Sequence, residues 1–233
     1  MNGLWVFGYG SLVWNPGFAY RDSKIGYICG YSRRFWQGND VHRGTPDRPG
    51  RVATLIEDCS GITWGRAFLL ENEDSNSSLA YLENREGKLG GYSATFVKFQ
   101  PRDRKEDTIP VLLYIARDNN RLYIGPTSLP QLATEIATSI GNCGHNAEYL
   151  MRLAHFMREN VPEYWDDHLF TLEMLVKDRL KEENIPLKSL MGDWDVFNDD
   201  YAPRQESVTE PSTSSRTDFS SLVPSRKLRC LNI

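Results

Sequence analysis

Apolar and polar residues alternate along much of the first part of the chain. Short stretches rich in β-branched and aromatic side chains, bounded by glycine, proline, asparagine or aspartate, indicate β-strands. Their alternation is typical of antiparallel strands that bury one face. The predicted strands are residues 4–7, 24–31, 51–57, 62–70, 92–99 and 111–117. A helix is predicted over residues 77–85, and the glycines that begin at Gly87 would end it.

Beyond residue 128 the apolar residues recur every three or four positions, as on one face of an α-helix. Helices are predicted over residues 130–140, 145–160 and 166–182, with Thr127 or Ser128 as the cap of the first. Strands followed by helices predict an α+β fold, a mostly antiparallel sheet or barrel with helices packed outside it. The apolar stripes expected to face the core are Leu132, Ile136 and Ile140, then Tyr149, Leu150, Leu153, Phe156 and Met157, then Leu169, Leu172, Val176 and Leu180.

The last part of the chain has a different composition. Residues 208–227 are rich in serine, threonine and proline, so residues 191–233 are predicted to be a disordered tail after a domain of residues 1–190. Cys230 stands four residues from the end and follows basic residues, as in a prenylation box. Asn232 and Ile233 depart from that pattern, so a solvated tail is expected rather than a lipid anchor.

Composition narrows the class of protein. The net charge of −4 argues against a general nucleic-acid binder, and no window approaches the roughly 18 apolar residues of a membrane span. The chain begins directly with strand-like sequence, so no cleaved signal is expected. Its cysteines form no C-x-x-C pair and its histidines have no i, i+4 spacing, which gives no support to a disulfide framework or a zinc site. These features favour a cytoplasmic protein that binds no metal, no nucleic acid and no membrane.

The sharpest motif is Gly8-Tyr9-Gly10-Ser11-Leu12, directly after the first predicted strand. Glycine tolerates backbone angles that aim several N–H groups into one hollow, where they can hold an anion or a developing oxyanion. The motif lacks the lysine of a P-loop and the third glycine of a dinucleotide fingerprint. Taken alone, it favours a simple tight turn over a binding site.

Other motifs accompany this turn. They are YSRRFWQG at 31–38, HRGTP at 42–46, PGRVATL at 49–55, YLENRE at 81–86, GGY at 90–92, YIGP at 123–126 and NAEYL at 146–150. In this order and spacing the chain closely resembles the ChaC-type γ-glutamylcyclotransferases, the glutathione-specific branch of their superfamily. The resemblance runs from about residue 4 to about residue 180. The glycine turn and Tyr-Leu-x-x-Arg-Glu are shared across the superfamily, whereas Arg-Arg-Phe-Trp-Gln and His-Arg-Gly point to this branch.

The resemblance implies a specific fold and reaction. The fold would be a small mixed barrel, mostly antiparallel and flanked by helices. The activity would be cleavage of glutathione to 5-oxoproline and cysteinylglycine, a carbon–nitrogen lyase reaction without metal or nucleotide cofactor. The resemblance places the catalytic glutamate at Glu86 and the substrate loop at Val6, Phe7, Gly8, Tyr9, Gly10, Ser11 and Leu12.

The chemistry agrees with these assignments. The α-amine of the γ-glutamyl group would attack its own γ-carbonyl, and such oriented intramolecular reactions reach effective molarities of about 10⁵–10⁸ M. The attacking amine must first lose a proton, and the leaving nitrogen must gain one. A single carboxylate such as Glu86 can serve both steps. Without the resemblance, however, a glutamate near a helix end beside Arg85 and Lys88 is more often a solvated charge.

Further polar and aromatic residues have two readings each. Arg34 is a candidate clamp for a substrate carboxylate, although neighbouring Arg33 and Arg34 on a strand point to opposite sides, so at most one should face the pocket. Tyr92 and Tyr149 are candidates to line the pocket, and a buried tyrosine tied to the backbone is an equally good reading. The His42–Arg43 segment is interpreted as a loop anchor.

Two other functions remain open. The same fold could act on other γ-glutamyl amino acids or on γ-glutamyl amines, which also gives 5-oxoproline. Alternatively, the domain could be a non-catalytic binding module that uses its tail for protein partners. Such a module would not need a carboxylate in its pocket, and the presence of Glu86 within the expected motif argues against it.

Overall fold

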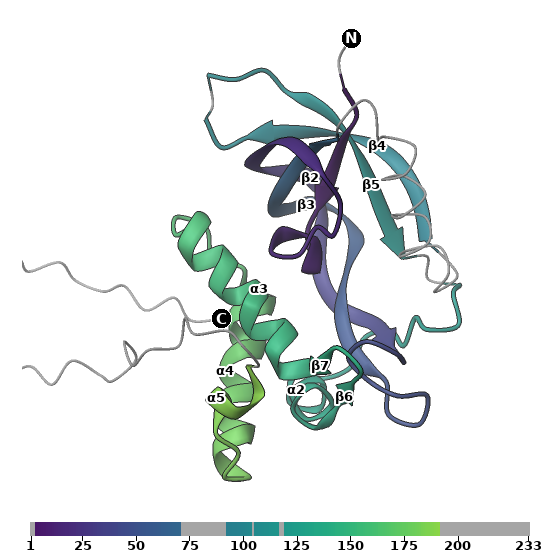
Figure 1. The fold of residues 1–233 in the computed structure, drawn as a ribbon, viewed down its shortest axis with the longest axis vertical. Helices are drawn as coiled ribbons and strands as arrows, with labels where there is room; N and C mark the ends of the chain where they lie inside the picture. Colours follow the sequence, from purple (N-terminus) through teal and green to yellow (C-terminus); the bar gives the residue numbers. More distant parts are fainter. Residues whose placement is uncertain (1–2, 71–91, 104, 117–118, 192–233) are drawn as a thin grey trace, which may run out of the picture. The chain divides into compact units, whose positions relative to one another are not determined.

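The computed structural model describes residues 3–70, 92–103, 105–116 and 119–191. The chain divides into two units, Met1–Trp194 and Asp195–Ile233, and every described residue belongs to the first. Five strands of this unit form a closed barrel in the order β1-β3-β2-β4-β5 (Figure 1). Paired strands run antiparallel except β1 and β5, which are parallel. The strands are β1 (Trp5–Gly8), β2 (Tyr20–Asn39), β3 (Gly50–Leu70), β4 (Tyr92–Pro101) and β5 (Ile109–Ala116).

Strands β2 and β3 are longer than predicted and pair along nearly their whole length. The predicted end of the first at residue 31 is wrong, because β2 continues to Asn39, and so is the predicted break of the second at residues 58–61. The register shifts between Cys29 and Tyr31, where Gly30 has a φ of 88° that glycine adopts readily. A Cβ added at Gly61 would lie 2.6 Å from the Tyr31 backbone. These glycines therefore bend two continuous strands at a bulge instead of ending them.

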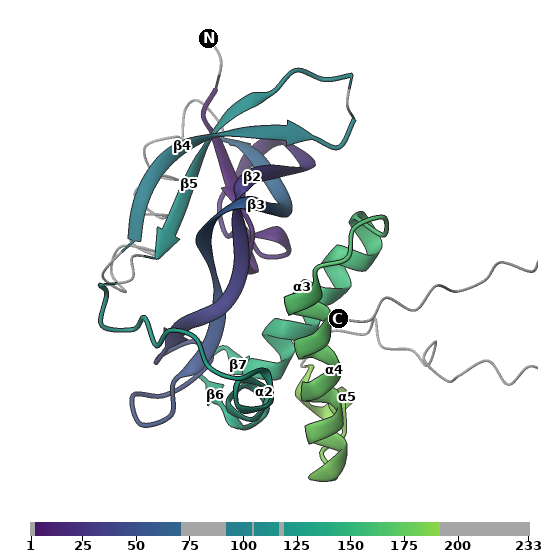
Figure 2. The same ribbon diagram turned by 180° about the vertical axis from the view of Figure 1, so that it is seen from behind.

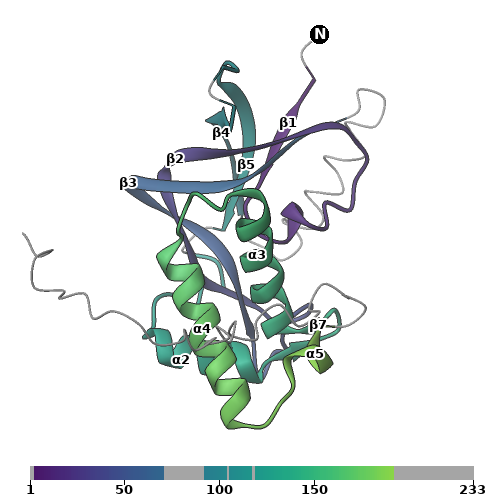
Figure 3. The same ribbon diagram turned by 90° about the vertical axis from the view of Figure 1, so that its left-hand side faces the viewer.

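The helices pack on one side of this long hairpin. Figure 3 shows α3 (Asn146–Asn160) and α4 (Asp167–Glu182) side by side against β3 and β2, with which they are in contact. In Figure 2, α2 (Leu129–Thr138) lies with the short strands β6 (Ile140–Gly141) and β7 (Gly144–His145) near the loop that joins β2 to β3. The last helix, α5, covers Leu187–Leu190.

Both faces of β1 are buried. Val6 is fully buried on one face and packs in a cluster with Phe68 and Leu112. Phe7 points to the other face, where its ring centroid lies 5.6 Å from that of Phe99. Since successive strand residues point to opposite faces, this arrangement requires cover on both sides of the strand. The segment after β1 provides part of that cover, because Leu12 belongs to the Val6 cluster.

The predicted fold class, an α+β barrel flanked by helices, is confirmed. The three predicted helices form, and Ser128 is the N-cap of α2, its hydroxyl accepting from the N–H of Gln131 at 3.4 Å. The prediction for Ile140 is wrong, because α2 ends at Thr138 and Ile140 is 58% exposed in β6. Among the described helices, none is long and apolar enough to cross a membrane. The predicted helix over 77–85 and the predicted tail lie outside the described residues, so the boundary at residue 190 stays a prediction.

Candidate active site

The glycine turn directly follows β1. The strand ends at Gly8, and the short 3-10 helix η1 (Ser11–Val13) begins three residues later. The N–H of Val13 donates to the carbonyl of Gly10 at 3.1 Å, which closes the turn. The first N–H groups of a helix have no partner inside that helix. The turn therefore places the backbone of Gly10 and Ser11 directly after the end of a barrel strand.

Glycine is required at two positions of this turn because other groups approach too closely for a side chain. A Cβ added at Gly8 would lie 2.7 Å from the Cβ of Leu12. A Cβ added at Gly10 would lie 2.6 Å from the hydroxyl oxygen of Tyr149. The two glycines thus let the chain fold back on itself and let a side chain from α3 rest on the turn.

Tyr149 reaches the turn from the first part of α3. Its hydroxyl oxygen accepts a hydrogen bond from the N–H of Ala53 in β3 at 3.2 Å. Its ring makes edge contacts with Trp14, 5.3 Å between centroids, and with Phe35, 6.1 Å. The side chain is only 5% exposed. The interpretation of Tyr149 as a buried tyrosine tied to the backbone is confirmed. It also lies against the predicted substrate loop, and a role in lining the pocket stays a prediction.

The side chains of several residues of the predicted loop pack in the core. Val6, Phe7 and Leu12 are buried, so their side chains pack and any substrate contact from these positions would come from their backbone. The hydroxyl of Tyr9 donates to the carbonyl of Tyr114 in β5 at 3.0 Å. The loop is thus fastened at its apolar positions, and the turn at Gly10 and Ser11 is its part nearest to Tyr149.

Arg33 and Arg34 lie near the start of α4. Arg33 is 2% exposed, lies 2.9 Å from a carboxylate oxygen of Asp166 and donates to the carbonyl of Trp64. These contacts tie β2 to β3 and to the start of α4. Arg33 and Arg34 both line a pocket of about 370 Å³ beside Asp166 and His168, and no residue of the glycine turn lines this pocket. Contact of Arg34 with substrate stays a prediction.

His168 stands beside Arg34 in the same pocket. Its Nε2 accepts a hydrogen bond from the N–H of Phe35 at 3.2 Å, and the two rings stack with centroids 6.0 Å apart. Burial, helped by the positive charge of Arg34, lowers the pKa of His168 to about 4. The imidazole is therefore neutral at pH 7, as its acceptor role requires.

The His42–Arg43 segment anchors the loop between β2 and β3, as predicted. The N–H groups of His42 and Arg43 both donate to the side-chain oxygen of Asn39, at 2.7 and 2.8 Å. The guanidinium of Arg43 lies 2.6 Å from the carboxylate of Glu148 and donates to the carbonyl of His145 at 3.0 Å. Burial, and then Arg43, lower the pKa of His145, whose ring nitrogen caps α3.

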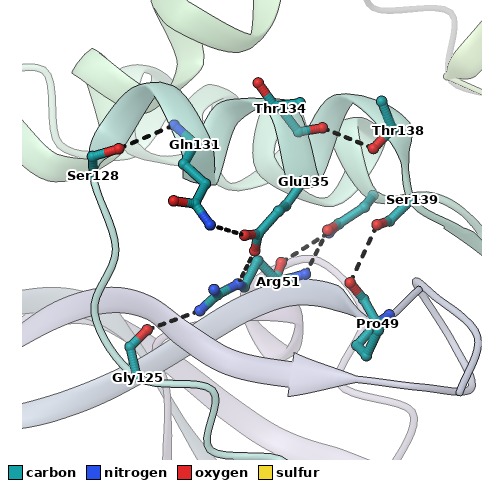
Figure 4. A network of polar contacts seen from close by, with 10 residues as sticks. Pro49, Arg51, Gly125, Ser128, Gln131, Thr134, Glu135, Thr138 and Ser139 are labelled. Carbon is teal, nitrogen blue, oxygen red and sulfur yellow. Dashed lines mark hydrogen bonds and ion pairs between the residues drawn. The ribbon is translucent and has the colours of Figure 1, made fainter. Parts of the chain in front are cut away.

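A network around Arg51 joins β3 to α2 (Figure 4), and Asn146 extends it to α3. The guanidinium of Arg51 bonds to Glu135 at 2.6 Å and to the carbonyl of Gly125 at 2.9 Å. The peptide of Arg51 is held by the side chain of Asn146. Sequence reasoning assigned none of these residues a role. Arg51, Gly125 and Asn146 each stand in a quoted motif, but their partners are 74 and 95 residues away in the chain.

The proposed catalytic residue cannot be placed in this arrangement. Glu86 lies outside the described residues. Tyr92 begins β4 opposite Ala116, and its side chain also lies outside what is described. Within the described ranges, no group of three or more His, Cys, Asp or Glu side chains is placed to hold a metal ion.

The barrel has the γ-glutamylcyclotransferase fold. It matches the crystal structure of a selenomethionine-labelled γ-glutamylcyclotransferase specific to glutathione from yeast, with a TM-score of 0.68 and 28% identity. The match covers 76% of this chain and 97% of the yeast chain.

Sequence comparison defines the family more narrowly. The model of the ChaC-like proteins matches residues 4–179. Glutathione-specific γ-glutamylcyclotransferase 1 of zebrafish (Danio rerio) is 51% identical over 170 residues, which cover 73% of this chain and 87% of the relative. The human protein of the same name is 49% identical over 166 residues, covering 71% and 75%. The chain belongs to the ChaC-like family, which confirms the resemblance carried by its motifs.

Proposed function

We propose that this chain cleaves glutathione into 5-oxoproline and cysteinylglycine. The observation that carries the proposal is the glycine turn at the end of β1, closed by Tyr149 within a barrel of the ChaC-like family. Relatives named as glutathione-specific γ-glutamylcyclotransferases match 71–73% of the chain at 49–51% identity. Glutathione is therefore the substrate of choice for the first assay.

The reaction needs only the atoms of one substrate molecule. The deprotonated α-amine of the γ-glutamyl group attacks the γ-carbonyl carbon and closes a five-membered ring. The bond from that carbon to the cysteine nitrogen then breaks, and the leaving amine takes up one proton. No water or cofactor enters the balance. The protein contributes a conformation that brings amine and carbonyl together, which is where intramolecular reactions gain most of their rate.

Backbone N–H groups near Gly10 and Ser11 would stabilise either the substrate carboxylate or the oxyanion of the tetrahedral intermediate. Their position at the end of β1 supports this role. Because β1 is buried on both faces and the Tyr149 hydroxyl packs against Gly10, the turn is held in a fixed position. Preorganised donors cost no rearrangement when charge develops. Phe7, Tyr9 and the other loop residues then shape the site chiefly by fastening this turn.

Glu86 would carry the proton from the attacking amine to the leaving amine. A general acid–base of this kind contributes about 10²–10⁴-fold. Glu86→Gln removes the proton carrier while keeping the side-chain shape, and Glu83→Gln in the same motif is the matched control. Full-length protein is incubated with reduced glutathione, and 5-oxoproline and cysteinylglycine are quantified by mass spectrometry. Activity of Glu86→Gln equal to that of the wild type would exclude Glu86 from this role.

Substrate choice is tested with the same assay. Glutathione and γ-glutamyl-alanine are compared at equal concentration, and the proposal requires a higher kcat/KM for glutathione. Faster turnover of γ-glutamyl-alanine would support the broader cyclotransferase instead. Arg34→Gln belongs in this comparison: KM for glutathione rises if the guanidinium of Arg34 binds the substrate, and stays unchanged if Arg34 serves only the start of α4.

The remaining assignments complete the proposal. The enzyme would act in the cytoplasm on a small-molecule substrate, and residues 1–190 would form the catalytic domain. Deletion of residues 191–233 should then leave glutathione turnover intact. Loss of turnover in that variant would place part of the function in the tail.

A further inference from the structure

Asn146 joins the network around Arg51 (Figure 4) to α3, the helix whose Tyr149 lies against the glycine turn. We propose that Asn146, the first residue of α3, is a positioning residue that holds the Tyr149 hydroxyl on Gly10. The inference rests on the proposed function, in which the glycine turn binds the reacting group. It assigns a role to a motif residue that the chemistry of the reaction does not itself require.

Asn146 grips one peptide unit of β3 at two points. Its side-chain oxygen accepts from the N–H of Arg51 at 2.6 Å, and its side-chain nitrogen donates to the carbonyl of Arg51 at 2.8 Å. Only a carboxamide places an acceptor and a donor side by side in this way. Asn146 has no exposed surface. The side chain of Asn146 therefore hydrogen-bonds to the edge of β3 in the way that the backbone of a paired strand would.

Tyr149 continues this contact along the same edge of β3. Amides two residues apart on a strand point the same way, so the N–H of Ala53 faces α3 as the N–H of Arg51 does. Tyr149, three residues after Asn146 on the same helix face, accepts from that N–H at 3.2 Å. Two side chains of one helix thus match two amides of one strand. If α3 slides along β3, both contacts break together.

Tyr149 is in direct contact with the glycine turn, so any movement of its hydroxyl would displace the turn. The site of a Cβ on Gly10 is 2.6 Å from the Tyr149 hydroxyl oxygen, so the turn rests directly on that atom. On the other side, a Cβ on Gly50 would lie 2.9 Å from the side-chain oxygen of Asn146. Gly50 therefore leaves the Asn146 side chain little room to move toward β3. A shift of α3 would move the hydroxyl relative to Gly10, and misplacement of about 1 Å is enough to reduce catalysis strongly.

The outer part of the same network provides a matched control. Glu135 binds the guanidinium of Arg51, not its peptide, and is itself held by Gln131 at 3.1 Å. Glu135→Gln weakens the attachment of α2 to β3 but leaves the two hydrogen bonds of Asn146 in place. It should lower the melting temperature without changing kcat or KM. A purely structural role of Asn146 would give the same result as this control.

The test is a double-mutant cycle between Asn146→Ala and Tyr149→Phe, measured as kcat/KM for glutathione. If Asn146 acts through the Tyr149 hydroxyl, Asn146→Ala lowers kcat/KM about tenfold in the wild type but less than about twofold in Tyr149→Phe. If Asn146→Ala does not yield folded protein, Asn146→Asp replaces it and is assayed at a pH where the carboxylate is ionised, since it then keeps the shape but cannot donate to the Arg51 carbonyl. Equal losses in both backgrounds would overturn the proposal.

A second measurement is independent of turnover. Amide hydrogen exchange of Ala53 should accelerate in Asn146→Ala and in Tyr149→Phe, but not in Glu135→Gln, because only the first two disturb its acceptor. Unchanged exchange in Asn146→Ala would also overturn the proposal. A wild-type protein that releases no 5-oxoproline would refute the proposed function, and the exchange experiment would then decide alone whether Asn146 positions Tyr149.

Discussion

The glycine turn after β1 and the Arg33–Arg34 segment of β2 both carry family motifs, but they meet the helices in different ways. At the turn, a neutral hydroxyl from α3 rests on backbone, and close packing leaves no room for a side chain at Gly10. At Arg33, a buried cation meets a carboxylate at the start of α4. The first contact depends on shape and the second on charge. Substitutions should therefore damage activity at the turn and stability at Arg33.

The largest effect is expected for Asp166→Asn. Asparagine is a good N-cap and can still accept from the N–H of Leu169, so this change removes mainly the charge opposite Arg33. Leaving a buried charge without its partner costs about 3–5 kcal/mol of unfolding free energy. Denaturant unfolding measures the loss, with the exposed neighbour Asp167→Asn as control. A large drop in kcat/KM of the folded protein would contradict the prediction, because substitutions at the Arg33–Asp166 pair should lower stability and not activity.

The next effect is a dependence of stability on pH through His168. Its pKa is about 4 in the folded state, whereas an unfolded histidine titrates near 6.5. Above pH 6.5 the group is neutral in both states and has no effect. Between pH 6.5 and 4 only the unfolded state takes up the proton, so the unfolding free energy falls by up to about 3 kcal/mol.

His168→Gln should remove most of this slope while keeping an acceptor near the N–H of Phe35. His145, whose pKa is also lowered, accounts for part of the remaining slope. His155→Gln on α3 controls for the loss of a histidine as such. A pH profile of unfolding free energy identical for wild type and His168→Gln would contradict the assignment.

Gly10→Ala tests the other side of the comparison. The added methyl group would meet the Tyr149 hydroxyl at 2.6 Å, so the turn must shift. We expect kcat/KM for glutathione to fall about 10²-fold, as for other small displacements of reacting groups. The double variant Gly10→Ala/Tyr149→Phe, which makes room for the methyl group, should be more active than Gly10→Ala alone. Wild-type activity of Gly10→Ala would show that the turn takes no part in the reaction.

The smallest effect is expected at the surface. Arg102 and Glu163 form an ion pair at 2.9 Å whose side chains are 45% and 47% exposed. Solvent and salt screen such pairs, which contribute less than about 1 kcal/mol. Glu163→Gln should therefore change the unfolding free energy by less than that amount. A loss of unfolding free energy as large as that of Asp166→Asn would mean that burial does not explain why the two ion pairs differ in their contribution to stability.

Local patterns predicted the helices well and the long strands only in part. The stripe of α4, from Leu169 to Leu180, repeats every three to four residues and is buried as expected. The predicted strands stop at residue 31, next to Gly30, and restart at residue 62, next to Gly61, because a glycine that bends a strand and one that bounds it have the same local signature. Pairing between β2 and β3 over nearly their whole length decides between the two.

The site shows the same division. The glycine turn could be found from the sequence, because its glycines stand in one short segment after a strand. Asn146 and Arg33 were not assigned their partners, because Arg51 is 95 residues from the first and Asp166 is 133 residues from the second. Side chains at such separations carry no pattern that local periodicity can detect. Their roles follow only from where the barrel and the helices bring them.

By itself, the sequence determined the three long helices, most strand positions, the glycine turn and the family, because these depend on neighbouring residues and on motif order. Only the tertiary structure decided that Gly10 is a glycine because of Tyr149 and that Arg33 serves α4. It also decided that Asn146 replaces a strand at the edge of β3. The physical reason is that steric room and hydrogen-bond partners belong to atoms close in space. These atoms belong to residues that lie far apart in the sequence.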